Sequence, residues 1–268
     1  MSTVLQSRLP FAPWADPRTR RLPGIIPLDM ADWLDIDDAY AGQMALRDGL
    51  IAERPKAVHA LAEAARPAAE ELYGLLLPLL PGLGFSIGPG TALRPDGVTV
   101  PLDPSQPLLT LGRLVQEDLM LMLPGPPPAD GLSAEHVLAG AVLCFPAGWT
   151  LAEKFGQPMG RIHVPVAIYT EDVARRVQRL LDGVQPGRPL VRGTAHHSNA
   201  PLFNPRTEAM GRAITGDLPF LRVERQCLLR LPQSRAVVFS VHTYVLRPEA
   251  LSAEQAALLR EFPIRHAA

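Results

Sequence analysis

The stretch FLRVERQCLLRLPQSRAVVFSVHTYVL, residues 220–246, decides the fold. It contains two apolar runs, 220–231 and 236–246, of the length and composition expected for β-strands. The link between the runs is only a few residues long. Two strands joined so closely must run in opposite directions, so the stretch predicts an antiparallel hairpin.

Strand alternation gives the first run of this hairpin two different faces. The apolar face is formed by Leu221, Val223, Cys227 and Leu229. The polar face is formed by Arg222, Glu224 and Gln226. That polar face lies either in solvent, where Arg–Glu pairs are ordinary, or along a pocket in which Glu224 is the carboxylate. A buried carboxylate without a paired cation has a raised pKa, which suits proton transfer or amine binding.

Further elements extend outward from the hairpin. We expect additional strands at 98–102, 137–145 and 190–196. We expect helices at 37–51, at 55–77 with a kink or break at Pro67, at 108–123, from Thr150 to about Gly156, after Thr170 and after Ser252. The pattern predicts an α+β fold, with helices packed on one face of an antiparallel sheet.

The division of the chain follows from the same pattern. We expect one domain over 1–268, with an N-terminal arm and a mainly helical region in 1–95 and the α+β core in 96–268. Pro10, Pro13, Pro17 and Pro23 indicate that the arm is extended and laid over a surface.

Composition excludes several functional classes. The 268 residues are 47% hydrophobic and 20% charged, with a formal net charge of −1. This balance is typical of a globular protein and gives no basic excess to attract nucleic acid. The longest strongly apolar stretch, 75–80, is interrupted by Pro78 and is far too short for a membrane span. The N-terminal sequence lacks a signal-peptide pattern, so we expect a cytoplasmic location.

Cysteine and histidine spacing argues against most metal centres. Cys144 and Cys227 lie far apart in apolar or mixed runs, without C-x-x-C or C-x-x-C-H, so both are expected to be buried free thiols. His196 and His197 are adjacent on an expected strand and therefore point to opposite faces. A site with several histidine ligands would have to arise from tertiary contacts alone.

His163 is the histidine with the most informative neighbours. It lies in IHVPV, residues 162–166, shortly before an expected helix. It is either an ordinary core histidine or a single strong ligand, and haem needs only one because the porphyrin supplies four nitrogens. Cations for haem propionates are available at Arg161, Arg192, Arg222 and Arg225.

Glu117 and Asp118 form an adjacent acidic pair. On the expected helix 108–123 their side chains diverge, so a structural role is favoured over a catalytic one.

Several segments together resemble a known family. They are PFAP at 10–13, WLDIDDAY at 33–40, LVQEDL at 114–119, LCFPAGWTLAEK at 143–154, IHVPV at 162–166, RVERQ at 222–226 and Leu231-Pro232. In order and spacing they resemble the haem-bearing alpha subunit of heme-dependent oxidative N-demethylase over most of the chain.

The resemblance implies a PAS-like haem-binding fold with added helices. It implies haem b, oxygen chemistry, and electrons from a flavin and iron–sulfur NAD(P)H-dependent reductase. It also implies that His163 is the haem-iron ligand and that Glu224 is the acid–base or amine-holding residue. Of the four candidate arginines, we expect Arg222 to help bind the cofactor.

The sequence departs from the family pattern at two places. After Arg192 an Asn-Trp pair is expected, but Gly193-Thr194 stands there. Before Thr243-Tyr244 an arginine is expected, but His242 stands there. Both segments are expected strands that could line the pocket.

Three hypotheses follow. The leading one is a haem-dependent monooxygenase component that demethylates a small N-methylated amine and releases formaldehyde. The second is a PAS-like haem or small-molecule sensor without turnover. The third is a haem-free structural subunit of an oxidoreductase.

Overall fold

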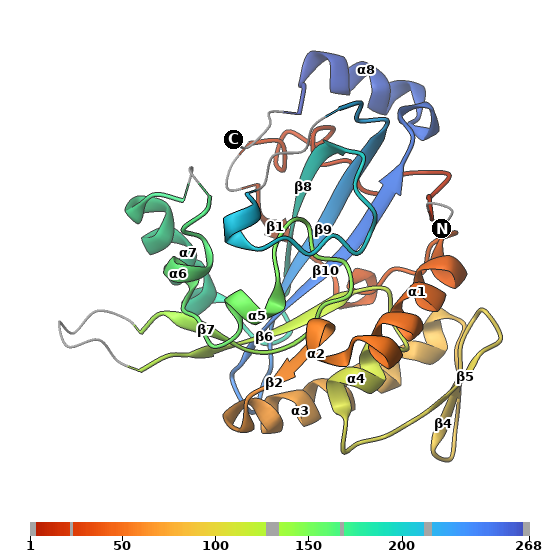
Figure 1. The fold of residues 1–268 in the computed structure, drawn as a ribbon, viewed down its shortest axis with the longest axis vertical. Coiled ribbons are helices and arrows are strands. Elements are labelled where there is room, and N and C mark those ends of the chain that lie inside the picture. The colour runs from red at the N-terminus through yellow and green to blue at the C-terminus, as the bar shows by residue number, and fades with distance from the viewer. Residues whose placement is uncertain (1–3, 22–23, 127–133, 167–168, 212–215, 265–268) are drawn as a thin grey trace.

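The structure, a computed structural model, describes residues 4–21, 24–126, 134–166, 169–211 and 216–264. The strands of its main sheet are β1 (Ile26–Pro27), β2 (His59–Leu61), β6 (Asp118–Pro124), β7 (His136–Val142), β8 (Leu190–Ser198), β9 (Phe220–Arg230) and β10 (Val237–Leu246). Their order is β1-β8-β9-β10-β6-β7-β2, and every neighbouring pair is antiparallel (Figure 1). The α+β prediction is confirmed.

The hairpin predicted from 220–246 lies at the centre of this sheet. Strands β9 and β10 pair without a register shift from Arg230 opposite Val237 to Leu221 opposite Leu246. Strand β8 pairs along the other edge of β9. The three longest strands therefore form one continuous surface.

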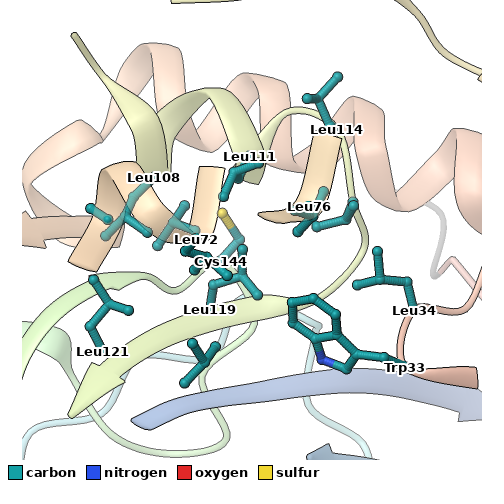
Figure 2. Packing of buried hydrophobic residues seen from close by; sticks show 14 of the residues in the cluster. Trp33, Leu34, Leu72, Leu76, Leu108, Leu111, Leu114, Leu119, Leu121 and Cys144 are labelled. Carbon is teal, nitrogen blue, oxygen red and sulfur yellow. The ribbon is translucent and has the colours of Figure 1, made fainter. Parts of the chain in front are cut away.

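Helices cover both faces of the sheet, not one face as the sequence pattern suggested. The helices are α1 (Tyr40–Glu53), α2 (Pro55–Val58), α3 (Arg66–Leu76), α4 (Pro107–Gly112), α5 (Leu151–Lys154), α6 (Met159–Ile162), α7 (Glu171–Gly183) and α8 (Ala253–Glu261). One core contains side chains of α1, α3 and α4 together with Leu119 and Leu121 of β6 (Figure 2). A second core contains side chains of α6 and α7 together with Met120 and Met122 of β6.

We call these two surfaces the α1 face and the α7 face. Strand β6 is apolar on both sides, so each side needs a covering layer. The α1 face also carries the N-terminal arm and α8, whose apolar side chains form a third cluster with Leu221, Val223 and Tyr244. Alternation then assigns every residue of β8, β9 and β10 to one face or the other.

The prediction of one helix over 108–123 is wrong. Helix α4 ends at Gly112, and β6 begins at Asp118. A continuous apolar run such as DLMLML fits a doubly buried strand as well as a helix, and periodicity cannot separate the two. The buried Arg47 side chain of α1 donates to the carbonyls of Gly112, Gln116 and Glu117, which fixes the turn between the two elements.

The region 55–77 also differs from its prediction. Strand β2 separates α2 from α3 and pairs with the edge of β7. Pro67 lies in the first turn of α3, where its missing N–H costs nothing, and so starts this helix instead of kinking it. A second sheet, β3 (Ser86–Gly88), β4 (Thr91–Leu93) and β5 (Thr99–Pro101), contains the strand expected near 98–102.

Two of the three helix starts predicted from capping residues have the expected cap. Thr170 accepts a hydrogen bond from the Val173 N–H at the start of α7, and Ser252 forms a complete capping box with Gln255 at the start of α8. Thr150 instead donates to the Glu153 carboxylate at 2.9 Å and caps no backbone N–H.

The N-terminal arm packs against the sheet, but turns at 13–15 and 17–19 interrupt the extended course expected for it. Gln6 pairs with the Val245 backbone in both directions, and the Trp14 indole donates to the Gln255 carbonyl. No helix in the described ranges is long and apolar enough to cross a membrane.

Candidate functional site

A band of polar residues crosses β8, β9 and β10 on the α7 face. In the antiparallel register, Gln226 and Glu224 of β9 lie opposite Arg192 and Thr194 of β8. On the other side of β9, Thr243 of β10 lies opposite Glu224. Directly opposite residues share a face of the sheet. We call this set of residues the polar wall; it comprises Arg192, Thr194, Arg222, Glu224, Gln226 and Thr243.

Glu224 lies at the centre of the polar wall. Its carboxylate accepts hydrogen bonds from Gln226 Nε2 at 3.1 Å and Thr194 Oγ1 at 3.5 Å. It also contacts Arg222 Nε at 3.4 Å, and its side chain is only 14% exposed. The predicted alternation of β9 is therefore confirmed. The carboxylate is held by neighbours on the α7 face and does not project into bulk solvent.

Arg222 is buried and anchors the chain around the polar wall. One terminal nitrogen donates to the Phe145 carbonyl at 2.5 Å, and the other donates to the Leu202 carbonyl at 3.4 Å. Its guanidinium thereby connects β9 to the loops after β7 and β8. Arg222 also lines a small pocket with His196, Asn204 and Arg206. A role in cofactor binding stays a prediction for this residue.

His163 follows α6 and belongs to the layer that covers the α7 face. Met159 and Ile162 of α6 pack into the core of that face. The ring of His163 donates from Nδ1 to the Met159 carbonyl at 2.9 Å and stacks on Tyr169 at 4.2 Å between centroids. A carbonyl only accepts, so in neutral His163 the proton lies on Nδ1 and the lone pair on Nε2. This is the tautomer that an Nε2 metal ligand needs.

His163 is half-buried, so the ring has neither the fully enclosed setting of a core histidine nor a free surface position. His163 and Glu224 come from different layers and lie on the same side of the sheet.

Two buried polar atoms of the polar wall have no hydrogen-bond partner in the described part of the chain. They are Arg192 Nε and Thr243 Oγ1. Burial lowers the pKa of Arg192, and the charge of Glu224 partly opposes this effect. Buried polar atoms are almost always paired, so these two unpaired atoms are unusual.

The two departures from the family pattern, at Gly193-Thr194 and at His242, include residues that lie on the α1 face of the sheet. A Cβ at Gly193 would lie 2.4 Å from both Phe11 and Pro13, so the arm requires a glycine there. Thr194, in contrast, reaches Glu224. Thr194 therefore shares a face with Glu224, whereas Gly193 and His242 lie on the α1 face; that these segments line the pocket stays a prediction.

His242 lies on the α1 face between two buried carboxylates. Its Nδ1 is 3.0 Å from Glu117 Oε1 and its Nε2 is 3.1 Å from Asp37 Oδ2. Burial alone lowers the pKa of His242, but these two hydrogen bonds and charges outweigh it and raise the pKa to about 9. The charged imidazole thus provides a buried cation at the position where the family pattern has arginine.

Sequence reasoning did not detect this cluster. It placed Glu117 and Asp118 on a helix, whereas Glu117 directly precedes β6 and Asp118 begins it. The two carboxylates have separate partners, His242 for Glu117 and Arg47 for Asp118. Thr243 was also missed, because an isolated threonine carries no chemical signal in sequence.

The remaining metal candidates are the two adjacent histidines and the two cysteines. His196 and His197 lie opposite Arg222 and Leu221 and thus on different faces. Within the described ranges, no group of three or more histidine, cysteine, aspartate or glutamate side chains could hold a metal ion. Both cysteines are buried free thiols, and burial raises their pKa values to about 12 for Cys144 and about 11 for Cys227.

Comparison with known families defines the class. The family described as haem-dependent oxidative N-demethylase, alpha subunit-like, matches residues 24–262. This match covers the main sheet, all eight helices named above and the polar wall. The chain therefore belongs to the haem-dependent oxidative N-demethylase alpha subunit-like family.

Proposed function

We propose that this protein binds haem b through His163 and oxidatively demethylates a small N-methylated amine, with electrons from a separate flavin and iron–sulfur reductase. The proposal keeps the PAS-like interpretation of the main sheet. The observation that carries it is the polar wall, with its centrally held carboxylate and two unpaired buried polar atoms, in a chain of this family.

The described residues fit a bound haem in two respects. His163 has its Nδ1 proton engaged with a backbone carbonyl, which directs the Nε2 lone pair to a ligand role. The buried Arg192 and Thr243 atoms need a partner that the described protein residues do not supply. When bound, haem supplies the activation of dioxygen that oxidises an N-methyl carbon, after which formaldehyde is released.

The protein contributes binding, orientation and proton handling. Glu224 accepts hydrogen bonds from Gln226 and Thr194, so its carboxylate orientation is fixed before substrate arrives. A carboxylate so fixed attracts an ammonium and accepts the N–H proton at an Oε atom. Arg222 holds the Glu224 strand against the Phe145 and Leu202 loops and so positions that carboxylate.

Reconstitution with haem tests the proposal. The purified chain is titrated with haem, then incubated with an N-methylated amine, NAD(P)H and a flavin and iron–sulfur reductase, and formaldehyde is measured. A Soret band with formaldehyde release supports the proposal. A Soret band without formaldehyde supports the sensor alternative, and the absence of a Soret band supports a haem-free subunit.

A further inference from the structure

Arg192, which is half-buried, differs from the buried arginines of the sheet. Arg225 donates to the carbonyls of Trp33 and Asp32, and Arg230 donates to the carbonyls of Val184 and Arg235. Arg222 is likewise engaged with two carbonyls and Glu224. Arg192, in contrast, has its Nε buried without a partner in the described part of the chain. A buried guanidinium donor left in this state is costly, and a ligand relieves that cost.

Arg192 Nε lacks a hydrogen-bond acceptor, and a charged acceptor suits a guanidinium best. Of the two guanidinium groups in the polar wall, Arg222 lies 3.4 Å from the Glu224 carboxylate, while Arg192 feels the charge of Glu224 but forms no ion pair with a residue in the described part of the chain. A guanidinium presents its donors as a planar fork that matches a carboxylate in bidentate geometry. Thr243 adds a hydroxyl, fully buried and also unpaired, on the same face two strands away.

We propose that Arg192 binds a carboxylate of the molecule that occupies this site. Two molecules can bring that carboxylate under the proposed function, on which this inference rests. One is a substrate that carries both an N-methyl amine and a carboxylate, that is, an N-methylated amino acid. The other is haem, through a propionate.

The register favours the substrate as the source. Arg192 lies opposite Gln226, and Glu224 lies two residues along the same strand, so Arg192 and Glu224 are diagonal neighbours. Such diagonal positions are about 7–8 Å apart, which long side chains can reach across. A short zwitterion placed between them meets Arg192 with its carboxylate and Glu224 with its ammonium.

The experiment compares wild type with Arg192→Gln and with a control, Arg188→Gln, whose arginine is exposed in the turn before β8. Dissociation constants are measured by calorimetry for sarcosine and for dimethylamine, and by absorbance for haem and for an iron porphyrin with esterified propionates. Loss of a charge-assisted hydrogen bond weakens binding by about tenfold or more. None of these readouts depends on turnover.

A substrate carboxylate predicts that Arg192→Gln weakens sarcosine binding at least tenfold, with dimethylamine and both porphyrins unaffected. A propionate predicts that the variant weakens haem at least tenfold and leaves the esterified porphyrin unaffected. Either result supports the inference, even in a protein that releases no formaldehyde. If wild type and a folded Arg192→Gln protein bind all four probes equally, the inference is wrong.

Two further variants guard against a folding defect in Arg192→Gln. Arg192→Lys keeps the charge and removes the fork, and is expected to recover only part of the lost affinity. Thr243→Val keeps the shape and removes the hydroxyl, and is expected to weaken the same probe as Arg192→Gln. Full affinity in both variants contradicts the inference.

Discussion

At the residue scale, the central feature is a carboxylate fixed by its own strand neighbours. Gln226 and Arg222 lie two residues on either side of Glu224, and strand alternation puts all three on one face. This part of the site was predictable from sequence, because it depends only on the period of two in a single strand.

Glu224→Gln tests the proposed proton and amine role. The substitution keeps the shape and removes the charge, so haem uptake should survive while turnover falls about a hundredfold, the usual scale for losing a positioned acid or base. Formaldehyde release per haem-loaded protein measures the effect. The control Glu249→Gln, on an exposed residue, should match wild type. Wild-type turnover in Glu224→Gln would refute the role.

His242 makes stability depend on pH. Its folded pKa of about 9 exceeds the ordinary value of 6.5 for histidine, so its contribution is complete below about pH 6.5 and is lost as pH rises through about 9. Asp37 acts in the opposite direction. Burial raises the pKa of Asp37, but hydrogen bonding to His242 and the charge of His242 outweigh burial, so the net shift is downward. The contribution of Asp37 to stability is therefore lost only in acid. The Tyr244 ring contacts the His242 ring at a tilt of 42°, with centroids 4.5 Å apart, and Arg225 lies opposite His242 on β9.

Urea unfolding between pH 6 and pH 9.5 measures this dependence. The wild-type free energy of unfolding should fall by about 3 kcal/mol across this range, following the shift of roughly two to three pKa units. His242→Gln should be less stable than wild type at pH 6 and should lack most of that fall. Parallel pH profiles for the two proteins would show that the imidazole is not charged between Asp37 and Glu117.

At the element scale, the break between α4 and β6 was invisible in the sequence. The apolar pattern of 108–123 fits a helix, and only a distant residue, Arg47 of α1, determines that the chain turns there. The same side chain forms an ion pair with Asp118 at 2.7 Å, and both groups are almost completely buried. Contacts this remote along the chain leave no local signal.

Arg47→Met should therefore destabilise the protein strongly. It preserves much of the side-chain volume but leaves Asp118 as an uncompensated buried charge, for which about 3–5 kcal/mol is typical. The control Arg113→Met breaks a pair with Asp48 that is partly exposed, and should cost no more than about 1 kcal/mol. Equilibrium unfolding in urea distinguishes them, and equal losses in the two variants would contradict the assigned role of Arg47.

At the scale of the whole molecule, the sequence predicted the strands and caps that depend on neighbours, and missed what depends on packing. The β9–β10 hairpin, the Thr170 cap and the Ser252 capping box follow from local periodicity and side-chain reach. The positions of edge strand β2 and of the helices on both faces depend on which apolar surfaces and edges of the sheet remain to be covered. The unpaired state of Arg192 Nε depends on how β8 packs in the folded sheet, which the local sequence does not specify.

The central claim is that His163 and the polar wall serve one bound haem. The most direct measurement is haem affinity, followed through the Soret band, in wild type, His163→Gly and a control, His59→Ala, in the edge strand β2. His163→Gly should weaken haem binding by more than about tenfold, and added imidazole should restore the wild-type spectrum. His59→Ala should bind haem as wild type does. An unchanged Soret band and unchanged haem affinity in His163→Gly would contradict the account.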